Sequence, residues 1–101
     1  METSALTLLS PVKLGDLELP NRVAMAALTR CRAGESAVPN DLHVEYYSAR
    51  ASSGFILTEC TPISPLGNAL LGCTGIYNDE QEEGWKRVTE AVHKKGGRIF
   101  L

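Results

Sequence analysis

The side chains in this sequence that could ligate a metal or form disulfides are three cysteines and two histidines. Zinc sites need ligands at characteristic close spacings, and these residues match no such pattern. An odd number of widely spaced cysteines without a C-x-x-C pair also argues against a disulfide framework. The sequence therefore predicts no metal site and three ordinary thiols in a reducing compartment. The five residues are Cys31, Cys60, Cys73, His43 and His93.

Thr29 and Cys60 are further candidates, because each follows an apolar run that is typical of a buried strand. A threonine in that place ordinarily bonds its own backbone in a turn, and an isolated cysteine ordinarily packs as a small residue. Neither strand is followed by a GxGxxG, GxxxxGK[ST] or GxSxG motif. This argues against a dinucleotide, nucleotide or hydrolase site of those kinds.

The elements that must position these residues alternate between strands and helices. Residues 12–19 alternate apolar and polar around a Gly-Asp pair, which is typical of a short hairpin. Apolar runs without alternation indicate strands covered on both faces. The long loop 60–78 is rich in Pro, Gly, Ser and Thr, and loops of that length are usually functional. The sequence predicts strands over 22–28, 55–58 and 98–101, and helices over 40–52 and 79–95.

Both predicted helices have a capping residue and an inner face. Asn40 is expected to cap the first helix, and Asn78 or Asp79 the second. Apolar side chains at helical spacing mark the faces that pack against the strands. The predicted inner residues are Leu42, Tyr46 and Ala49 in the first helix and Trp85, Val88 and Val92 in the second.

The composition is that of an ordinary globular chain with one domain at most. The 101 residues are 44% hydrophobic and 22% charged, with a formal net charge of −2. Such a charge offers no footprint for nucleic acid, and no apolar run approaches the roughly 18 residues of a membrane span. Glu2 stands where a signal peptide carries positive charge. A cytoplasmic protein that binds neither nucleic acid nor membrane is expected.

Residues 98–101 start a strand that is still apolar where the sequence stops, which is unusual at the free end of a domain. The chain is therefore expected to be a truncated α/β unit. Two βα units and a third strand are compatible with a (β/α)8 barrel of about 250 residues. They are equally compatible with a doubly wound, flavodoxin-type sheet.

Three stretches together resemble the old yellow enzyme family of flavin-dependent ene reductases. Residues 21–30 (NRVAMAALTR) are similar to the family's NR-hydrophobic-MAPLTR strand and loop. Residues 46–59 (YYSARASSGFILTE) are similar to YYxxRAxxGLIITE, and residues 75–97 contain the GIY, GW and AVHxxGG segments. Their order and spacing over about 80 residues make chance agreement improbable, and the resemblance extends from Leu9 to the chain end.

The resemblance implies a (β/α)8 TIM barrel whose lower end is plugged by an N-terminal β-hairpin. Residues 1–101 would be the N-terminal part of a single FMN-binding barrel domain, comprising the hairpin and the first two to three βα units. The family reduces FMN with NADPH or NADH. It then passes hydride to the C=C of an enone-type substrate, and FMN sits at the carboxyl ends of the strands, as barrel physics requires.

Four residues occupy the family's flavin-contacting positions. Ala27, Leu28 and Thr29 would line the flavin, with the Thr29 hydroxyl donating to flavin O4, and Cys60 would contact it through its backbone. The family's flavin-binding glutamine, substrate-binding histidine pair, tyrosine proton donor and phosphate-binding arginine all come later in the barrel. No catalytic residue is therefore expected in this chain.

Departures from the family pattern put the substrate in doubt. Ala27 replaces a proline, so the turn loses a fixed φ. Leu70 falls near a position that is usually aromatic in the substrate pocket, and Thr74 replaces the proline before Gly-Ile-Tyr.

Three functional hypotheses follow. The first is an FMN-dependent ene reductase of which this chain is an inactive fragment. The second is a non-catalytic truncated flavoprotein relative with an interaction role. The third is a self-contained flavodoxin-like domain, which would bind flavin by itself.

Overall fold

The computed structural model describes residues 7–101, so the region of Glu2 lies outside the described residues. A short 3-10 turn, η2 (Thr7–Leu9), leads into the antiparallel strands β1 (Val12–Leu14) and β2 (Leu17–Leu19). Val12 pairs with Leu19 and Leu14 with Leu17, and Gly15 takes a φ of +59° in the turn. Glycine suits this left-handed conformation. The predicted hairpin is confirmed.

The remaining strands form a parallel three-stranded sheet. β3 (Ala24–Met25), β4 (Phe55–Leu57) and β5 (Ile99–Phe100) lie in the order β3-β4-β5. β4 pairs parallel to both neighbours, with Met25 opposite Ile56 and Ile56 opposite Ile99. The two βαβ connections predicted from the sequence are therefore present.

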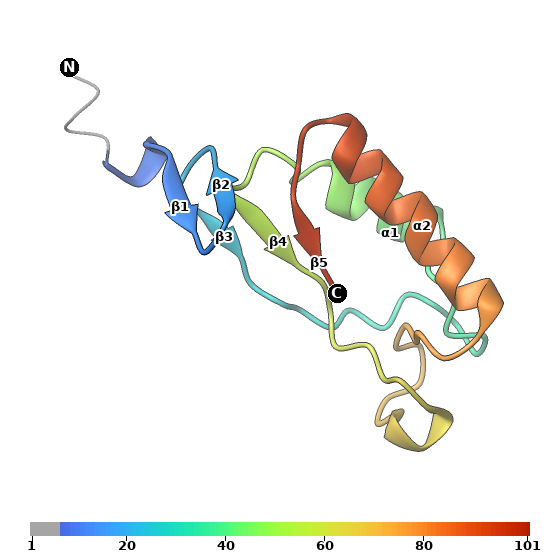
Figure 1. The fold of residues 1–101 in the computed structure, drawn as a ribbon. Coiled ribbons are helices and arrows are strands. Elements are labelled where there is room, and N and C mark those ends of the chain that lie inside the picture. Colours follow the sequence, from blue (N-terminus) through green and yellow to red (C-terminus); the bar gives the residue numbers. More distant parts are fainter. Residues whose placement is uncertain (1–6) are drawn as a thin grey trace.

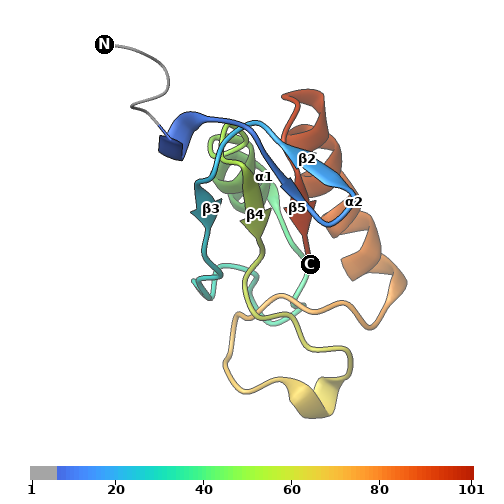
Figure 2. The ribbon, with the colours of Figure 1, turned by 60° about the vertical axis from the view of Figure 1, so that its left-hand side comes forward.

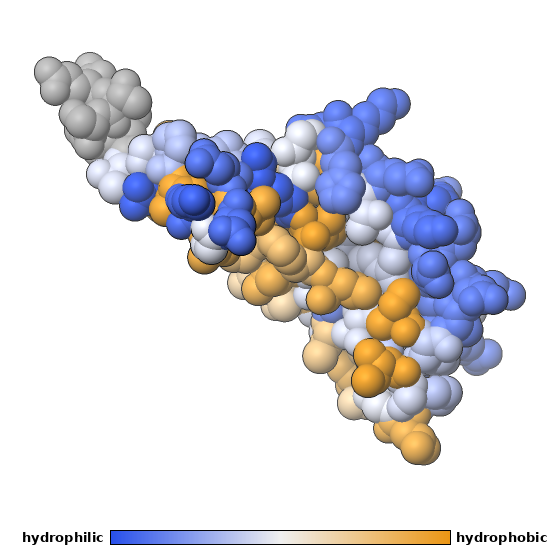
Figure 3. Space-filling model, in the orientation of Figure 1, coloured by the Kyte–Doolittle hydropathy of each residue, from blue (hydrophilic) through white to orange (hydrophobic). Residues whose placement is uncertain are grey.

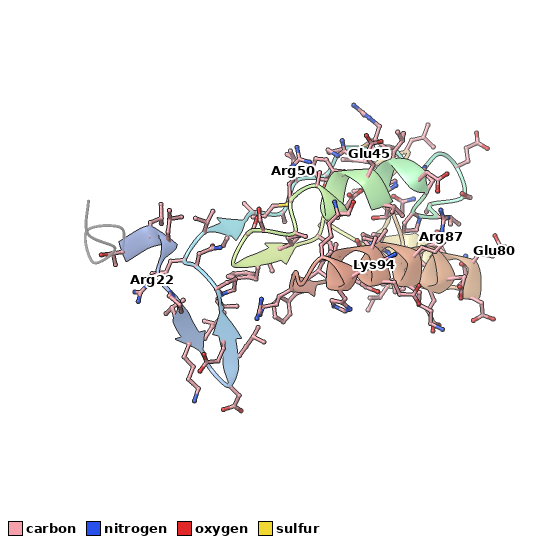
Figure 4. The ribbon with its side chains drawn as sticks, turned by 90° about the horizontal axis from the view of Figure 1, so that it is seen from above. Arg22, Glu45, Arg50, Glu80, Arg87 and Lys94 are labelled. Atoms are coloured by element: carbon pink, nitrogen blue, oxygen red, sulfur yellow. The ribbon has the colours of Figure 1, made fainter. Side chains whose placement is uncertain are left out.

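Two helices, α1 (Asp41–Ser48) and α2 (Asp79–Lys94), lie side by side on one face of this sheet (Figure 1). Figure 4 shows the pair from above, with Glu45 on α1 and Arg87 on α2. Arg87 forms an exposed ion pair with Asp41 of the neighbouring helix, an interaction worth at most about 1 kcal/mol. Burial provides the larger contribution, in a core of Tyr47, Ala51, Ile56, Trp85, Val88 and Val92.

The prediction for α2 is confirmed in its cap and its face. The Asn78 side chain accepts a hydrogen bond from the backbone N–H of Gln81. Trp85, Val88 and Val92 are buried at 4%, 0% and 0% exposure. The long apolar face and the acidic first turn were sufficient to position this helix from sequence.

The prediction for α1 is correct in its cap and wrong in its end, and of its predicted face only Tyr46, which is half-buried, packs against the core. Asn40 caps the helix as expected, but the helix ends at Ser48, and turns replace its last part up to Gly54. Gly54 packs so closely that a Cβ there would lie 2.4 Å from the carbonyl oxygen of Asn21. The buried residues of α1 are His43 and Tyr47, whereas Leu42 is 54% exposed.

The strand predicted over residues 22–28 is also wrong in part. Only two residues pair, and neither Val23 nor Leu28 is buried. Within residues 7–101, β3 has only β4 as a neighbour, and the helices cover only one face of the sheet. Figure 3 shows that the opposite face is apolar and open, whereas the outer surface of α2 is hydrophilic. Exposed apolar side chains on the strands include Leu57 and Phe100.

The two ends of the sheet carry different structures. The β1-β2 hairpin lies at the end where the parallel strands begin (Figure 1). The long segments that follow β3 and β4 extend beyond the opposite end, and the second of them carries the 3-10 turn η3 (Pro65–Gly67) (Figure 2). Within the described part of the chain, no helix is long and apolar enough to cross a membrane.

Candidate functional site

The four predicted site residues follow the carboxyl ends of two adjacent parallel strands. Ala27, Leu28 and Thr29 come after β3, and Cys60 comes after β4. The register pairs Ala24 with Phe55 and Met25 with Ile56, a constant offset of 31 positions. Thr29 and Cys60 are separated by the same offset (60 − 29 = 31). The strand pairing therefore directs both segments to one edge of the sheet.

This edge is open and offers both apolar and polar groups. Leu28 is 58% exposed, Ala27 and Cys60 are exposed, and Thr29 is half-buried. Within residues 7–101 the Thr29 hydroxyl makes no hydrogen bond, so the turn role that threonine often has in this place is not used. A flat apolar group could lie against Ala27 and Leu28, and the Thr29 hydroxyl is free to donate a hydrogen bond to a polar atom at its rim.

The cysteines remain separate thiols. Cys60 is exposed, Cys31 is half-buried and Cys73 is buried. Burial, with a smaller contribution from the neighbouring Cys31 thiol, raises the pKa of Cys73. A raised pKa keeps the thiol protonated and weakly nucleophilic. Among the described residues, no three His, Cys, Asp or Glu side chains come together in a way that could hold a metal ion.

Arg30, which follows Thr29, turns away toward helix α1. Its guanidinium lies 3.5 Å from the centroid of the Tyr46 ring, and that of Arg50 lies 4.1 Å from the same centroid. A cavity of about 280 Å³ lies beside this stack, and Arg32 and Glu45 also line it. The cation–π contacts hold the segment after β3 against α1.

A buried polar network lies directly behind the edge. The hydroxyl of Tyr47 donates to Oε2 of Glu59 at 2.6 Å and accepts the Glu59 backbone N–H at 2.9 Å. Nε2 of His43 lies 3.6 Å from Oε1 of the same carboxylate, and both side chains have 0% exposure. The network connects the inner face of α1 to the residue that precedes Cys60.

The protonation states in this network follow from burial and hydrogen bonding. Burial acts to raise the pKa of Glu59, but the nearby His43 imidazole and the hydrogen bond from Tyr47 outweigh it and bring the pKa below its ordinary value of 4.5. Burial, together with the hydrogen bond to Glu59, raises the pKa of Tyr47. At neutral pH the network therefore holds an ionised carboxylate and a protonated phenol.

Sequence reasoning did not find this network. His43 was considered only as a possible metal ligand, and neither Tyr47 nor Glu59 was assigned a functional role. His43 and Tyr47 are four residues apart, so they share a helix face. That spacing, opposite a glutamate at a strand end, was the available signal.

The long loop after Cys60 is fastened at its base and open at its tip. The hydroxyls of Thr61 and Thr74 lie 3.1 Å apart, and the backbone N–H of Ile76 donates to Pro62 at 3.0 Å. Leu70, at the predicted substrate-pocket position, is 53% exposed. The loop that includes Leu70 extends beyond the end of the sheet where β4 stops (Figure 2), and the Leu70 side chain is not packed.

Comparison with known proteins identifies relatives along nearly the whole chain. The sequence matches the profile of the NADH:flavin oxidoreductase / NADH oxidase family over residues 7–101. It is 46% identical over 93 residues to a probable flavin mononucleotide-dependent alkene reductase of Leishmania infantum, covering 92% of this chain and 26% of that protein. It is 44% identical over 99 residues to 12-oxophytodienoate reductase 1 of Oryza sativa subsp. japonica, covering 97% and 26%. The chain spans about a quarter of the length of these relatives.

Solved structures share the fold. Morphinone reductase in complex with tetrahydroNAD superposes with a TM-score of 0.89 at 53% identity, covering 93% of this chain and 26% of that one. The old yellow enzyme from Trypanosoma cruzi superposes with a TM-score of 0.91 at 47% identity, covering 97% and 26%. The expected architecture, an incomplete TIM barrel with an N-terminal hairpin, is confirmed. The chain belongs to the NADH:flavin oxidoreductase / NADH oxidase family, as a relative of the old yellow enzymes.

Proposed function

We propose that this chain forms the first part of the flavin-binding face of an FMN-dependent ene reductase. The observation that carries the proposal is the common edge formed by residues 27–29 and Cys60, at the carboxyl ends of adjacent parallel strands. Enzymes built on (β/α)8 barrels use that end of the strands for their sites. FMN is thus the expected cofactor, with NADPH or NADH as reductant and an enone-type alkene as substrate.

The residues present at this edge fit a flavin. Leu28 and Ala27 are exposed apolar groups that can lie against a ring, and the Thr29 hydroxyl has no partner within residues 7–101. When bound, FMN supplies the hydride chemistry that no amino-acid side chain provides. Thr29 would hold a proton donor at flavin O4, and the backbone at Cys60 would position the ring edge.

The rest of the site is proposed to lie in later barrel segments. By "complete enzyme" we mean the protein in which this chain is followed by those segments. Because the chain spans about a quarter of its relatives, the chain alone is expected to be catalytically inactive. Its free cysteines agree with a cytoplasmic location.

The test compares the isolated chain with the complete enzyme. The complete enzyme should show flavin absorbance, bind FMN stoichiometrically and oxidise NADPH or NADH when cyclohexenone is added. The isolated chain should show none of these three properties. It should also self-associate in size-exclusion chromatography, because its open sheet face is apolar (Figure 3). The barrel relatives rule out the flavodoxin-type fold, so a yellow, monomeric isolated chain would instead show that these residues bind FMN without the rest of the barrel. A complete enzyme without FMN would support the non-catalytic relative.

Replacement of Thr29 by alanine should lower the reduction potential of bound FMN. A donor at O4 stabilises the negative charge that develops on the reduced ring, and a hydrogen bond to a charged group contributes roughly 1.5–3 kcal/mol. The T29A complete enzyme should therefore be reduced more slowly by NADPH in stopped-flow measurements. Thr29→Ser, which keeps the hydroxyl, should stay near the wild type. An unchanged potential in T29A would remove Thr29 from the site.

A further inference from the structure

Glu59 is a buried charge at a place where the fold does not require one. It lies one residue after Thr58 and one before Cys60, at the end of β4, and its side chain has 0% exposure. Buried ion pairs often stabilise a fold no better than well-packed apolar residues of similar volume. Buried ionisable groups with specific polar partners are found preferentially at functional sites. The geometry around Glu59 indicates what such a role would be.

The carboxylate accepts a hydrogen bond on one oxygen and faces an imidazole nitrogen with the other. The backbone N–H of Asn40 donates to Nδ1 of His43 at 3.0 Å. Since a backbone N–H can only donate, Nδ1 is the acceptor, and the proton of the neutral ring is on Nε2. That Nε2 faces Glu59 Oε1 at 3.6 Å, a contact too long for a hydrogen bond, and neither atom has a hydrogen-bond partner within residues 7–101. Tyr47 donates to Oε2.

The same network fixes the backbone that leads to the site. The Tyr47 hydroxyl accepts the Glu59 N–H at 2.9 Å, and the Thr61 hydroxyl donates to the Glu59 carbonyl oxygen at 2.8 Å. Both bonds are made by the backbone of Glu59, the residue before Cys60, and the second reaches across Cys60 to Thr61. Cys60 is exposed, whereas Thr58 and Glu59 are buried. The chain thus emerges toward the open edge directly from the residue that carries the charge.

A buried charge acts on its surroundings more strongly than a surface charge. Water and salt screen exposed carboxylates, but a pair inside the protein is screened much less. Reduction of a flavin adds negative charge to its ring. A fixed carboxylate next to the proposed flavin position would therefore oppose reduction and lower the reduction potential. The Thr29 hydroxyl is proposed to have the opposite effect.

We propose that Glu59 is a positioning residue that fixes the backbone of Cys60 against the flavin and whose buried negative charge lowers the flavin's reduction potential. This inference rests on the proposed function, because it requires FMN at the edge formed by residues 27–29 and Cys60. The placement of the Glu59 side chain itself depends only on contacts with α1, all of which lie within the described residues.

The test measures the FMN reduction potential of the complete enzyme with Glu59→Gln. Glutamine keeps the shape of the side chain and can still accept from Tyr47, but it has no charge. The potential should become more positive, the half-reaction with NADPH should become faster, and reoxidation by cyclohexenone should become slower. The matched control is Glu45→Gln, which removes an exposed carboxylate from α1 (Figure 4) and should leave the potential unchanged.

The outcomes separate this inference from the proposed function. If the wild type binds FMN and reduces the alkene but E59Q has the wild-type potential, Glu59 has only a structural role and the inference is wrong. If the wild type binds no FMN, the proposed function itself fails. If E59Q does not retain FMN, the inference is tested with Glu59→Asp, because aspartate keeps the negative charge. The infrared difference spectrum between oxidised and reduced enzyme should then contain a carboxylate band that differs between wild type and E59D. Identical spectra would overturn the inference.

Discussion

Replacing Tyr47 by phenylalanine should lower the free energy of unfolding of the complete enzyme by about 3–5 kcal/mol. The hydroxyl satisfies two buried groups at once, Oε2 of Glu59 at 2.6 Å and the Glu59 backbone N–H at 2.9 Å. Phenylalanine fills nearly the same volume, so the loss comes from unpaired polar groups and not from a cavity. A domain is stable by only about 5–15 kcal/mol, so this change is large. Urea unfolding followed by far-UV circular dichroism measures it.

Tyr46→Phe is the matched control for this prediction. Tyr46 is the adjacent residue in α1, and its hydroxyl has no hydrogen bond within the part of the chain that the structure describes. Its ring contacts with Arg30 and Arg50 are retained by phenylalanine. Y46F should therefore change stability by less than about 1 kcal/mol. Equal losses in the two variants would show that the Tyr47–Glu59 hydrogen bonds contribute little.

The effect of Y47F should also depend on pH. Because the folded-state pKa of Glu59 is lowered, its ionisation stabilises the fold above the ordinary value of 4.5, and this contribution is lost as the pH falls through the folded-state pKa. Replacing Tyr47 by phenylalanine removes the hydrogen-bond donor that helps to lower the pKa of Glu59. The stability difference between wild type and Y47F should therefore be largest near neutral pH and should narrow in acid. A constant difference across that range would indicate that Glu59 is not ionised.

The two helices show what local sequence can and cannot predict. In α2, the Asn78 cap and the apolar spacing of Trp85, Val88 and Val92 agree, and the prediction was correct. In α1, the inner face is defined by His43 and Tyr47, which are polar enough to read as surface. Their burial is set by Glu59, which is 12 or more residues away in sequence. The four-residue spacing of His43 and Tyr47 places them on one helix face, but it does not by itself show that this face is buried.

The candidate site likewise contains residues that the sequence could place and residues that it could not. Thr29 and Cys60 could be placed from the sequence, because each follows a strand and parallel strands end at one edge. Their contacts with FMN remain predictions. The network behind Cys60 could not be found, because it depends on how α1 packs against β4. The burial of residues 22–28 was predicted wrongly, because a strand's second face is covered only when further elements are present.

Replacing Ile56 by alanine should destabilise the apolar core strongly, with a loss of about 2–5 kcal/mol in the free energy of unfolding. Ile56 is 0% exposed and packs with Tyr47, Trp85, Val88 and Val92 between the sheet and the helices. The cavity left by alanine would be lined by large side chains from two helices, which cannot close it without separating from the sheet. The loss should appear in both the isolated chain and the complete enzyme, as a lower thermal midpoint of the far-UV circular dichroism signal.

Leu57→Ala, one residue along β4, is the matched control that separates the two faces of the sheet. Leu57 is 41% exposed on the face opposite the helices, which Figure 3 shows as an open apolar surface. In the isolated chain L57A should leave the thermal midpoint nearly unchanged and reduce self-association. In the complete enzyme the same face would point into the packed barrel interior, so L57A should then cost about as much as I56A. If L57A leaves the stability of the complete enzyme unchanged, this face does not line a barrel. The proposed flavin edge at the carboxyl end of the barrel strands would then also be wrong.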